Sequence, residues 1–386
     1  MTAQLSHGIL YLYYFFVNIP LDIYNETDWK GETMKNNIVI FFLSCIGGII
    51  FFSAHIPLPW TIGPLVTTLL WKTVRKKPIH WPKSIRNTGL IFLGYAMGSP
   101  FTLQVGQQIL DQLPGMLLTT FTTMTLSLLA GWFTCRFTGV GMVNGLVGSI
   151  PGGLSQMAVI CEEIDGADVA VVTLMQITRV LTVVFIVPML AIYGLSNNST
   201  PLPLFASTAS LQFEQFLPFG IVCIISAFIA RVIRIPTPYL MGPVIGTIAL
   251  IIQGYNAPHL PQYITALAQI LIGIRMGADI TFDGLTNWKS IVSYSFGGVI
   301  FVIAGSLGID YMLVKLYGIP FLTAFISTAP GGITEMGLTA MTVHADVSLV
   351  VAYQLFRLLS MLLFGIPLLR WWLGKKAVHK TLQPTL

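Results

Sequence analysis

The sequence contains very little charge. Only 9% of its 386 residues are Asp, Glu, Lys or Arg, whereas 54% are hydrophobic, and the mean hydropathy is +0.78. Soluble domains carry about 25% charged residues, because a surface that faces water needs them. This composition excludes a cytosolic enzyme and a free DNA-binding protein. It predicts an all-α polytopic membrane protein that is embedded in a lipid bilayer.

Groups of residues that catalyse reactions or bind metals are also missing. The six histidines lie at segment ends or in loops, and no two of them have the spacing of metal ligands. The four cysteines form no Cys-x-x-Cys pair, so neither a disulfide framework nor a zinc site is indicated. Phosphate-binding glycine loops, nucleophile elbows and zinc-protease motifs do not occur. We therefore expect no enzymatic activity, no metal and no cofactor.

The N-terminal end of the chain differs from the remainder. Residues 8–20 are apolar, but they are fewer than the roughly 20 residues that a spanning helix needs. A polar stretch follows, and a long apolar run begins after Met34-Lys35-Asn36-Asn37. Residues 1–36 are therefore interpreted as an N-terminal extension. Its first 33 residues are an interfacial helix, a weak additional span or an over-extended start.

The main part of the chain is an internal duplication. His55–Leu65 reappears as Arg234–Val244, a shift of 234 − 55 = 179 positions that preserves the pattern Ile-Pro-x-Pro-x-x-x-Gly-Pro. Ser149–Met157 reappears as Thr328–Met336 with the same shift. The expected organisation is membrane repeat 1 at residues 37–193, an inter-repeat loop at 194–213, membrane repeat 2 at 214–372 and a C-terminal tail at 373–386.

Each repeat contains six apolar segments. In repeat 1 they cover about residues 37–54, 57–71, 88–105, 113–135, 142–160 and 168–192. In repeat 2 they cover about residues 214–230, 236–253, 264–282, 290–314, 319–341 and 346–371. The fifth segment of each repeat carries Pro-Gly-Gly in its middle, so we do not expect it to be a continuous helix.

The placement of Lys and Arg predicts the orientation of the two repeats. The loop between the second and third segments of repeat 1 is strongly basic, whereas its counterpart at residues 251–265 has no charged residue. Loops of opposite character indicate opposite sides of the membrane, and hence two inverted repeats of about five crossings each with a re-entrant fifth segment. Parallel repeats of six crossings each would leave more basic residues outside.

In the inverted arrangement sixteen of the twenty basic residues lie on the cytoplasmic side, and Lys315 is the only one on the opposite side of the membrane. It predicts a bacterial inner (cell) membrane protein with a cytoplasmic C-terminus. The net charge of +5 then reflects cytoplasmic loops, and we expect no nucleic-acid partner.

Two arginines, Arg179 and Arg357, lie near the centres of the sixth segments. An arginine at mid-membrane costs about 2.5–3.5 kcal/mol on insertion scales, so each one needs a partner. Gln176 and Gln354 precede them by three positions and therefore share the same helix face. Each arginine either binds open carbonyl groups of the neighbouring broken segment or faces a central anion site, and the two interpretations are compatible.

The Pro-Gly-Gly motifs are candidate substrate-binding elements. They comprise Pro151, Gly152 and Gly153 in repeat 1, and Pro330, Gly331 and Gly332 in repeat 2. A helix that begins after such a break directs its positive end into the membrane interior, where Ser155 or Thr334 would cap the helix or contact an anionic ligand. The alternative is a close helix crossing that needs small residues.

Three acids are candidates for coupling to a proton or a cation. Glu335 follows the second break and has a glutamine, Gln156, as its counterpart; it couples an ion or pairs with Arg357 or Arg275. Asp168 and Asp346 each precede an arginine by eleven positions. That spacing is about 16 Å along a helix, so helix capping explains them better than pairing. Arg275 and Asp279 are four residues apart and are expected to pair with each other.

Four features together resemble the AbrB-type integral membrane family in its duplicated Gram-negative form. They are Pro-x-x-x-Gly-Pro after the first span (Pro59 to Pro64 and Pro238 to Pro243), Ser-Ile-Pro-Gly-Gly, Gly-Ala-Asp and Gln-x-x-Arg. The resemblance covers about residues 37–372. His344, which stands where the family has a glycine, and Glu335 depart from the family pattern. Members are labelled regulators of gene expression or ammonia monooxygenases, and no residues here support either label.

The predicted function is that of a secondary-transporter-like protein. It would move a small anionic or zwitterionic solute by alternating access, with the solute held between the two breaks near Arg179 and Arg357, and with one repeat rocking against the other. The alternative is a membrane-bound sensor or regulatory protein that affects gene expression indirectly and transports nothing.

Overall fold

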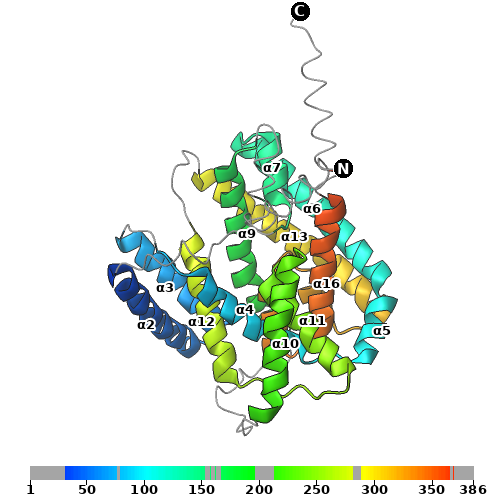
Figure 1. Ribbon diagram of the computed structural model, residues 1–386. Coiled ribbons are helices and arrows are strands. Elements are labelled where there is room, and N and C mark those ends of the chain that lie inside the picture. Colours follow the sequence, from blue (N-terminus) through cyan, green and yellow to red (C-terminus); the bar gives the residue numbers. More distant parts are fainter. Residues whose placement is uncertain are drawn as a thin grey trace, which may run out of the picture.

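The computed structural model describes residues 31–75, 79–152, 157, 161, 167–195, 213–280, 288–365 and 368. Within these residues the chain is helical and forms no β-strand, so the expected all-α class is confirmed (Figure 1). The N-terminal extension before residue 31, most of the inter-repeat loop and the whole C-terminal tail lie outside the described residues.

The helices follow the duplicated order. Repeat 1 contains α2 (Gly31–Ser53), α3 (Pro59–Arg75), α4 (Lys83–Gly98), α5 (Leu103–Asp111), α6 (Leu113–Thr138), α7 (Met142–Ser149), α9 (Val169–Met189) and the π-helical segment η1 (Leu190–Leu195). Repeat 2 contains α10 (Phe213–Val232), α11 (Pro238–Ile252), α12 (Gln262–Asp279), α13 (Trp288–Tyr317), α14 (Phe321–Thr328), α15 (Ile333–Thr342), α16 (Val347–Ser360) and the π-helical segment η2 (Met361–Gly365). The third apolar segment of repeat 1 divides at Pro100, which lacks an N–H, into α4 and α5.

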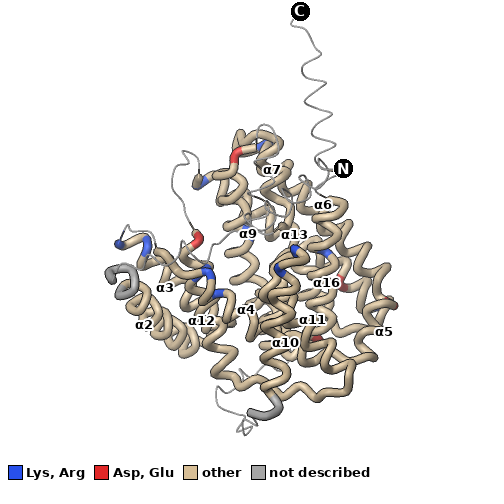
Figure 2. Tube along the Cα trace, viewed as in Figure 1, with Lys and Arg blue, Asp and Glu red and all other residues tan. Residues whose placement is uncertain are grey.

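Five helices in the described part of the chain are long and apolar enough to cross a membrane. They cover Asn36–Ser53, Leu113–Thr138, Val169–Leu195, Trp288–Tyr317 and Val347–Gly365. Charged residues are sparse along the bodies of the helices (Figure 2). Length, composition and charge placement together identify a membrane protein.

The duplication is visible in the backbone. His55 and Leu58 have positive φ angles of 58° and 49°, and their counterparts Arg234 and Thr237 have φ angles of 63° and 48°. Non-glycine residues rarely adopt this left-handed conformation. Its recurrence at positions 179 apart shows that the two repeats share the same local structure between their first and second helices.

The two repeats are interlocked rather than placed side by side. In repeat 1, Gly94 of α4 lies against the Leu240 carbonyl of α11, and a Cβ at Gly94 would be 2.9 Å from Pro243 Cβ. The equivalent contact places Gly273 of α12 against the Thr61 carbonyl of α3. The third helix of each repeat therefore packs on the second helix of the other, and glycine permits the close approach.

The helices form two groups (Figure 1). The first three helices of both repeats (α2, α3, α4, α10, α11 and α12) pack against one another, and the remaining long helices gather around the α6–α13 pair. A hydrophobic cluster that includes Ile62, Leu93 and Leu240 from the first group, with Val184 and Val351 from the second, joins them. The breaks belong to the second group.

The interlocking contact predicts a specific pattern of glycine sensitivity. We expect Gly94→Ala and Gly273→Ala each to lower the free energy of unfolding by about 1–3 kcal/mol, because the added methyl group overpacks a helix backbone. Gly106→Ala is the control, since nothing lies within 4 Å of a Cβ at that position. The measurement is thermal unfolding of the purified protein. A wild-type Tm for Gly94→Ala would contradict the packing.

Candidate functional site

The first break begins where α7 ends at Ser149. Ile150 is extended, with φ −63° and ψ 128°, and Pro151 follows it without a backbone donor. The N–H of Gly152 donates to the Ile150 carbonyl at 2.8 Å, which closes a tight turn. Two expected site residues, Gly153 and Ser155, lie outside the described residues.

The second break has the same geometry. After α14, Ala329 is extended, with φ −49° and ψ 136°, and the N–H of Gly331 donates to the Ala329 carbonyl at 2.8 Å. Helix α15 begins after the extended residue Gly332, which serves as its N-cap. The helix interruption that Pro-Gly-Gly predicted is therefore confirmed at this position.

Gln176 and Arg179 of α9 bind the open carbonyls of the first break. The Gln176 amide donates to the carbonyl oxygens of Gly148 and Ile150 at 3.1 and 2.8 Å. Arg179 donates from Nη1 to Ile150 and from Nη2 to Gly152, both at 2.9 Å. Helix α9 thus supplies the donors that a continuous helix would have supplied itself.

The second break is bound in the same way by α16. The Gln354 amide donates to the carbonyl oxygens of Ile326 at 3.0 Å and of Ser327 and Ala329 at 3.2 Å. Arg357 donates from Nη1 to Ala329 at 2.7 Å and Thr328 at 3.2 Å, and from Nη2 to Gly331 at 2.6 Å. Arg357 Nη2 also donates to the Gln354 side-chain oxygen. We call each Gln–Arg pair, with the carbonyls it binds, a clamp.

The clamps confirm the carbonyl interpretation of the two arginines. Both are buried, at 7% exposure for Arg179 and 5% for Arg357, so neither reaches water through its long side chain. Their partners are neutral carbonyls, and the one ion pair within the described residues joins Arg275 to Asp279. The clamps therefore satisfy hydrogen bonds and leave two buried positive charges without a carboxylate partner.

The aspartates before each clamp helix are N-caps. Asp168 accepts from the N–H of Ala170 at 2.9 Å, and Asp346 accepts from the N–H of Leu349 at 3.0 Å. The backbone N–H of Asp168 donates to Asn144 Oδ1 at 2.7 Å, which ties the start of α9 to α7. Capping, which the sequence favoured, is confirmed, while a coupling role for these aspartates stays a prediction.

A cavity of about 30 Å³ lies between the α6–α13 pair and the two breaks. Its walls include Ser149 beside the first break, Pro330 in the second, Arg179 from its clamp and Ser295 from α13. Arg179 Nε and Ser295 Oγ are buried without a hydrogen-bond partner among the described residues. The cavity has room for about two water molecules. The cavity therefore lies between the two repeats and contains a positively charged side chain and two polar groups, Arg179 Nε and Ser295 Oγ, that are free to bind a ligand.

Glu335 and Thr334 border a second, smaller cavity. Its volume is about 10 Å³, and Thr61 of α3 and Gln269 of α12 line it with them. The Glu335 carboxylate folds back over Gly332 at the start of α15. It is near enough to Arg179 and Arg86 for electrostatic attraction, but no ion pair to Arg357 or Arg275 is formed among the described residues.

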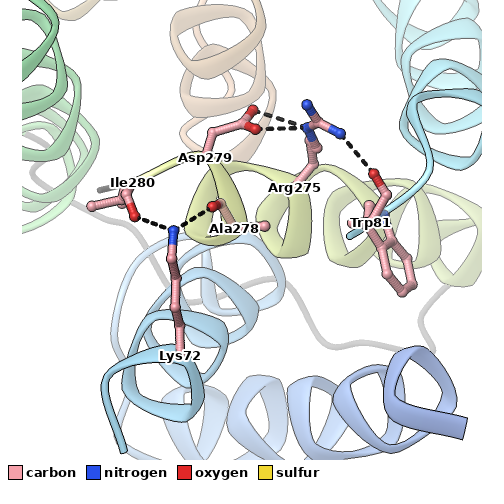
Figure 3. A network of polar contacts seen from close by, with 6 residues as sticks. All are labelled: Lys72, Trp81, Arg275, Ala278, Asp279 and Ile280. Atoms are coloured by element: carbon pink, nitrogen blue, oxygen red, sulfur yellow. Dashed lines mark hydrogen bonds and ion pairs between the residues drawn. The ribbon is translucent and has the colours of Figure 1, made fainter. Parts of the chain in front are cut away.

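Arg275 forms the local pair that the sequence predicted. Its Nε lies 2.9 Å from Asp279 Oδ1, and its Nη1 donates to the Trp81 carbonyl at 2.6 Å (Figure 3). Lys72 of α3 reaches across to donate to the carbonyls of Ala278 and Ile280 at 2.8 and 2.6 Å. These contacts fasten the C-terminal end of α12 to repeat 1.

The structure adds one buried acid that the sequence motifs did not indicate, Asp310 of α13. Its side chain is 0% exposed, and Oδ1 lies 2.5 Å from the hydroxyl of Thr328, the last residue of α14 before the break. Its counterpart in repeat 1 is Gly131, since 310 − 179 = 131. This mismatch within a long apolar segment was a signal that could have identified it.

Comparison with known proteins assigns the chain to a family. The family model described as "Transition state regulatory protein AbrB" matches residues 32–373. The chain belongs to the AbrB family. It is 27% identical to "Uncharacterized protein YhjN" of Bacillus subtilis (strain 168), over 88% of this chain and 94% of the relative. It is 25% identical to "Putative regulator AbrB" of Escherichia coli (strain K12), over 84% of this chain and 92% of the relative.

One departure of this chain from the AbrB family pattern has a backbone consequence. His344, which precedes Ala345 and the N-cap Asp346, has φ 55°. Glycine adopts that left-handed conformation without steric cost, so the glycine of the resembling sequences suits this turn. Histidine is tolerated here as a single left-handed residue between α15 and α16.

The clamp predicts how an AbrB-family chain depends on its glutamines. We expect Gln354→Leu to lower the free energy of unfolding by about 1–3 kcal/mol, because it leaves buried carbonyls with fewer donors while its volume is nearly unchanged. The control is Gln253→Leu, at an exposed glutamine that ends α11. Thermal unfolding measures both variants, and equal Tm values would contradict the clamp's contribution.

Proposed function

We propose that this AbrB-family protein is a secondary-transporter-like protein of the bacterial inner membrane. It moves a small anionic or zwitterionic solute by alternating access, and the solute binds between the two Pro-Gly-Gly breaks. The observation that carries the proposal is the 30 Å³ cavity that touches both breaks and contains Arg179 Nε and Ser295 Oγ, which have no partner among the described residues. A buried cation with an unused donor favours a negatively charged ligand group.

The size of the cavity supports a conformational cycle. About 30 Å³ admits water molecules or one small inorganic ion, but no organic solute. A larger solute requires the breaks to separate, and each break consists of extended backbone that tolerates such movement better than a helix does. The described conformation would then be a closed state of the cycle.

The packing of α6 against α13 supports inverted repeats. Phe137 stacks on Tyr294 with ring centroids 5.5 Å apart, Gly298 faces Ala130, and Gly305 faces Leu126. Residue numbers rise along one helix as they fall along the other, so the two helices are antiparallel. Equivalent spanning helices that run antiparallel are related by an axis in the membrane plane, which is the inverted arrangement. Each broken segment then enters and leaves on one side of the membrane.

The interlocked contacts favour a motion different from the rocking of one repeat against the other. Such rocking would separate Gly94 from Leu240 and Gly273 from Thr61, where backbones are in close contact. Movement of the group that contains the breaks against the group that contains α3, α4, α11 and α12 preserves both contacts. It requires sliding only along the apolar cluster between the groups.

A second candidate is a membrane-bound sensor or regulatory protein. The names of the matched family model and of the Escherichia coli relative favour it, because both refer to regulation. A sensor would use the same cavity to bind its ligand and would change conformation without moving the ligand across the membrane. Flux distinguishes the two functions.

The inverted topology predicts where the polar loop after α11 lies. Cysteine introduced at Tyr255, which is 51% exposed, should react with a membrane-impermeant maleimide on intact spheroplasts. Cysteine at Ser84, an exposed residue in the first turn of α4 beside the basic loop, is the matched control and should react only after permeabilisation. Equal protection of both positions would indicate parallel repeats.

The transport proposal predicts that filling the cavity stops flux. Labelled small anions and amino acids are tested in turn for uptake into proteoliposomes, and we expect Ser295→Leu to reduce uptake at least about tenfold by occupying the cavity. Ser293→Leu, on an exposed position of the same helix, is the control and should retain wild-type uptake. Stabilisation of the wild type by a compound that is never taken up would favour the sensor.

A further inference from the structure

Asp310 is a fully buried carboxyl group that no function described above uses. Its Oδ1 lies 2.5 Å from Thr328 Oγ1, and its Oδ2 has no hydrogen-bond partner among the described residues. A carboxylate accepts up to about four hydrogen bonds, so an ionised Asp310 would have most of its acceptor sites empty. An ionised group in that state is strongly disfavoured in a membrane interior.

Among the described residues, the helices packed against α13 place no positive charge in contact with Asp310. They are α6, α9 and α14. Helix α14 has no titratable residue, and those of α6, Cys135 and Arg136, are at the end that packs near Tyr294, far along α13 from Asp310. Arg179 of α9 borders the cavity beside Ser295, near that same end. On α13 itself, Tyr311 is exposed and lies under Lys315, away from the buried face.

Arg357 is linked to Asp310 through Thr328, which contacts both residues, but the arginine does not contact the carboxyl group itself. Its Nη1 donates to the backbone carbonyl oxygen of Thr328 at 3.2 Å, whereas Asp310 contacts the side-chain hydroxyl of the same residue. The arginine donors are shared among Thr328, Ala329, Gly331 and Gln354. Thr328 therefore connects the buried acid to the clamp without neutralising it.

The hydroxyl of Thr328 indicates where a proton resides. Thr328 Oγ1 lies 2.5 Å from Asp310 Oδ1 and 3.2 Å from the Phe325 carbonyl oxygen. A hydroxyl has a single proton to donate. If Thr328 donates to Phe325, the short contact between two oxygens requires a proton from Asp310. A protonated carboxyl satisfies both contacts and leaves Oδ2 as an unpaired neutral carbonyl, which is far less costly than an unpaired carboxylate.

We propose that Asp310 is a proton-binding site, occupied in the described conformation, whose carboxyl proton is donated to Thr328 Oγ1 beside the second break. When Asp310 ionises, its proton passes to water and the Thr328 hydroxyl turns from the Phe325 carbonyl toward the carboxylate. That change acts on the last residue of α14, whose carbonyl Arg357 holds. The role as the coupling ion of a transport cycle rests on the proposed function, whereas the proton site itself does not.

The absence of an equivalent in repeat 1 supports a dedicated role. Gly131 occupies the matching position on α6 and packs against Gly145 and Ser149, the counterparts of Ala324 and Thr328. The repeat architecture is therefore compatible with a small residue here. Asp310 is therefore not required by the fold that the two repeats share, and this buried acid occurs beside the second break alone.

Infrared spectroscopy of the purified full chain tests the site without any solute. We expect a protonated-carboxyl band that shifts when aspartate is labelled with ¹³C at its side-chain carboxyl group, that disappears in Asp310→Asn, and that persists in Glu335→Gln. Thr328→Val should move the band, because it removes the hydrogen-bond acceptor. A wild-type spectrum without a labelled aspartic-acid band overturns the proposal, even if Asp310→Asn fails to fold.

The pH dependence of stability gives a second readout. Aspartate in the unfolded chain ionises near pH 4, whereas the fold opposes ionisation of Asp310, so stability falls as pH rises above that value. The Tm of Asp310→Asn minus that of wild type should therefore increase between about pH 5 and pH 9. Asp111→Asn, at an exposed aspartate that ends α5, should show no such trend. A constant difference for Asp310→Asn contradicts the proton site.

The two proposals fail separately. A labelled band in a protein that takes up no tested compound leaves the proton site intact and removes transport. Uptake by a protein without the band removes the proton site and leaves transport intact.

Discussion

The structure depends on how a helix can be broken inside a membrane. Where Pro-Gly-Gly interrupts a helix, carbonyl groups lose their intrahelical donors in a region that has no water to replace them. In this protein a glutamine and an arginine, one turn apart on the following long helix, supply those donors at 2.6–3.4 Å. The cost of placing a guanidinium group in the membrane interior is offset by the carbonyls that it satisfies. The carbonyls need donors and the guanidinium group needs acceptors, so each satisfies the other.

This solution has an electrostatic consequence. Carbonyl oxygens accept hydrogen bonds from an arginine without removing its net charge. Because both clamps use carbonyls, each break has a buried positive charge beside it, and that of Arg179 borders a cavity. A structural device for closing two helix breaks thereby produces a site suited to a negatively charged group.

Symmetry and its exceptions have separate roles in the molecule. The duplicated features form the framework: the paired left-handed turns, the exchanged glycine contacts, the breaks, the clamps and the aspartate caps. Several ionisable residues have no counterpart in the other repeat, and they include Asp310, Glu335, Arg275 and Lys72. The first three lie in repeat 2 and Lys72 reaches it, so the two breaks are alike in shape and different in the ionisable groups around them.

The sequence by itself determined the features that depend on covalent chemistry and short spacing. Proline and glycine specify where a helix stops, aspartate before an apolar run specifies a cap, and the spacing of four positions from Arg275 to Asp279 specifies a pair. The repeat length, the helical class and the membrane environment follow from patterns that extend along the chain. Only the tertiary structure decided which surfaces meet. Three features join residues from different helices. Helices α4 and α12 each pack on the second helix of the other repeat, Asp310 contacts Thr328, and one cavity is lined by Ser149, Arg179, Ser295 and Pro330. No local preference specifies these contacts, because they depend on how closely whole helices pack.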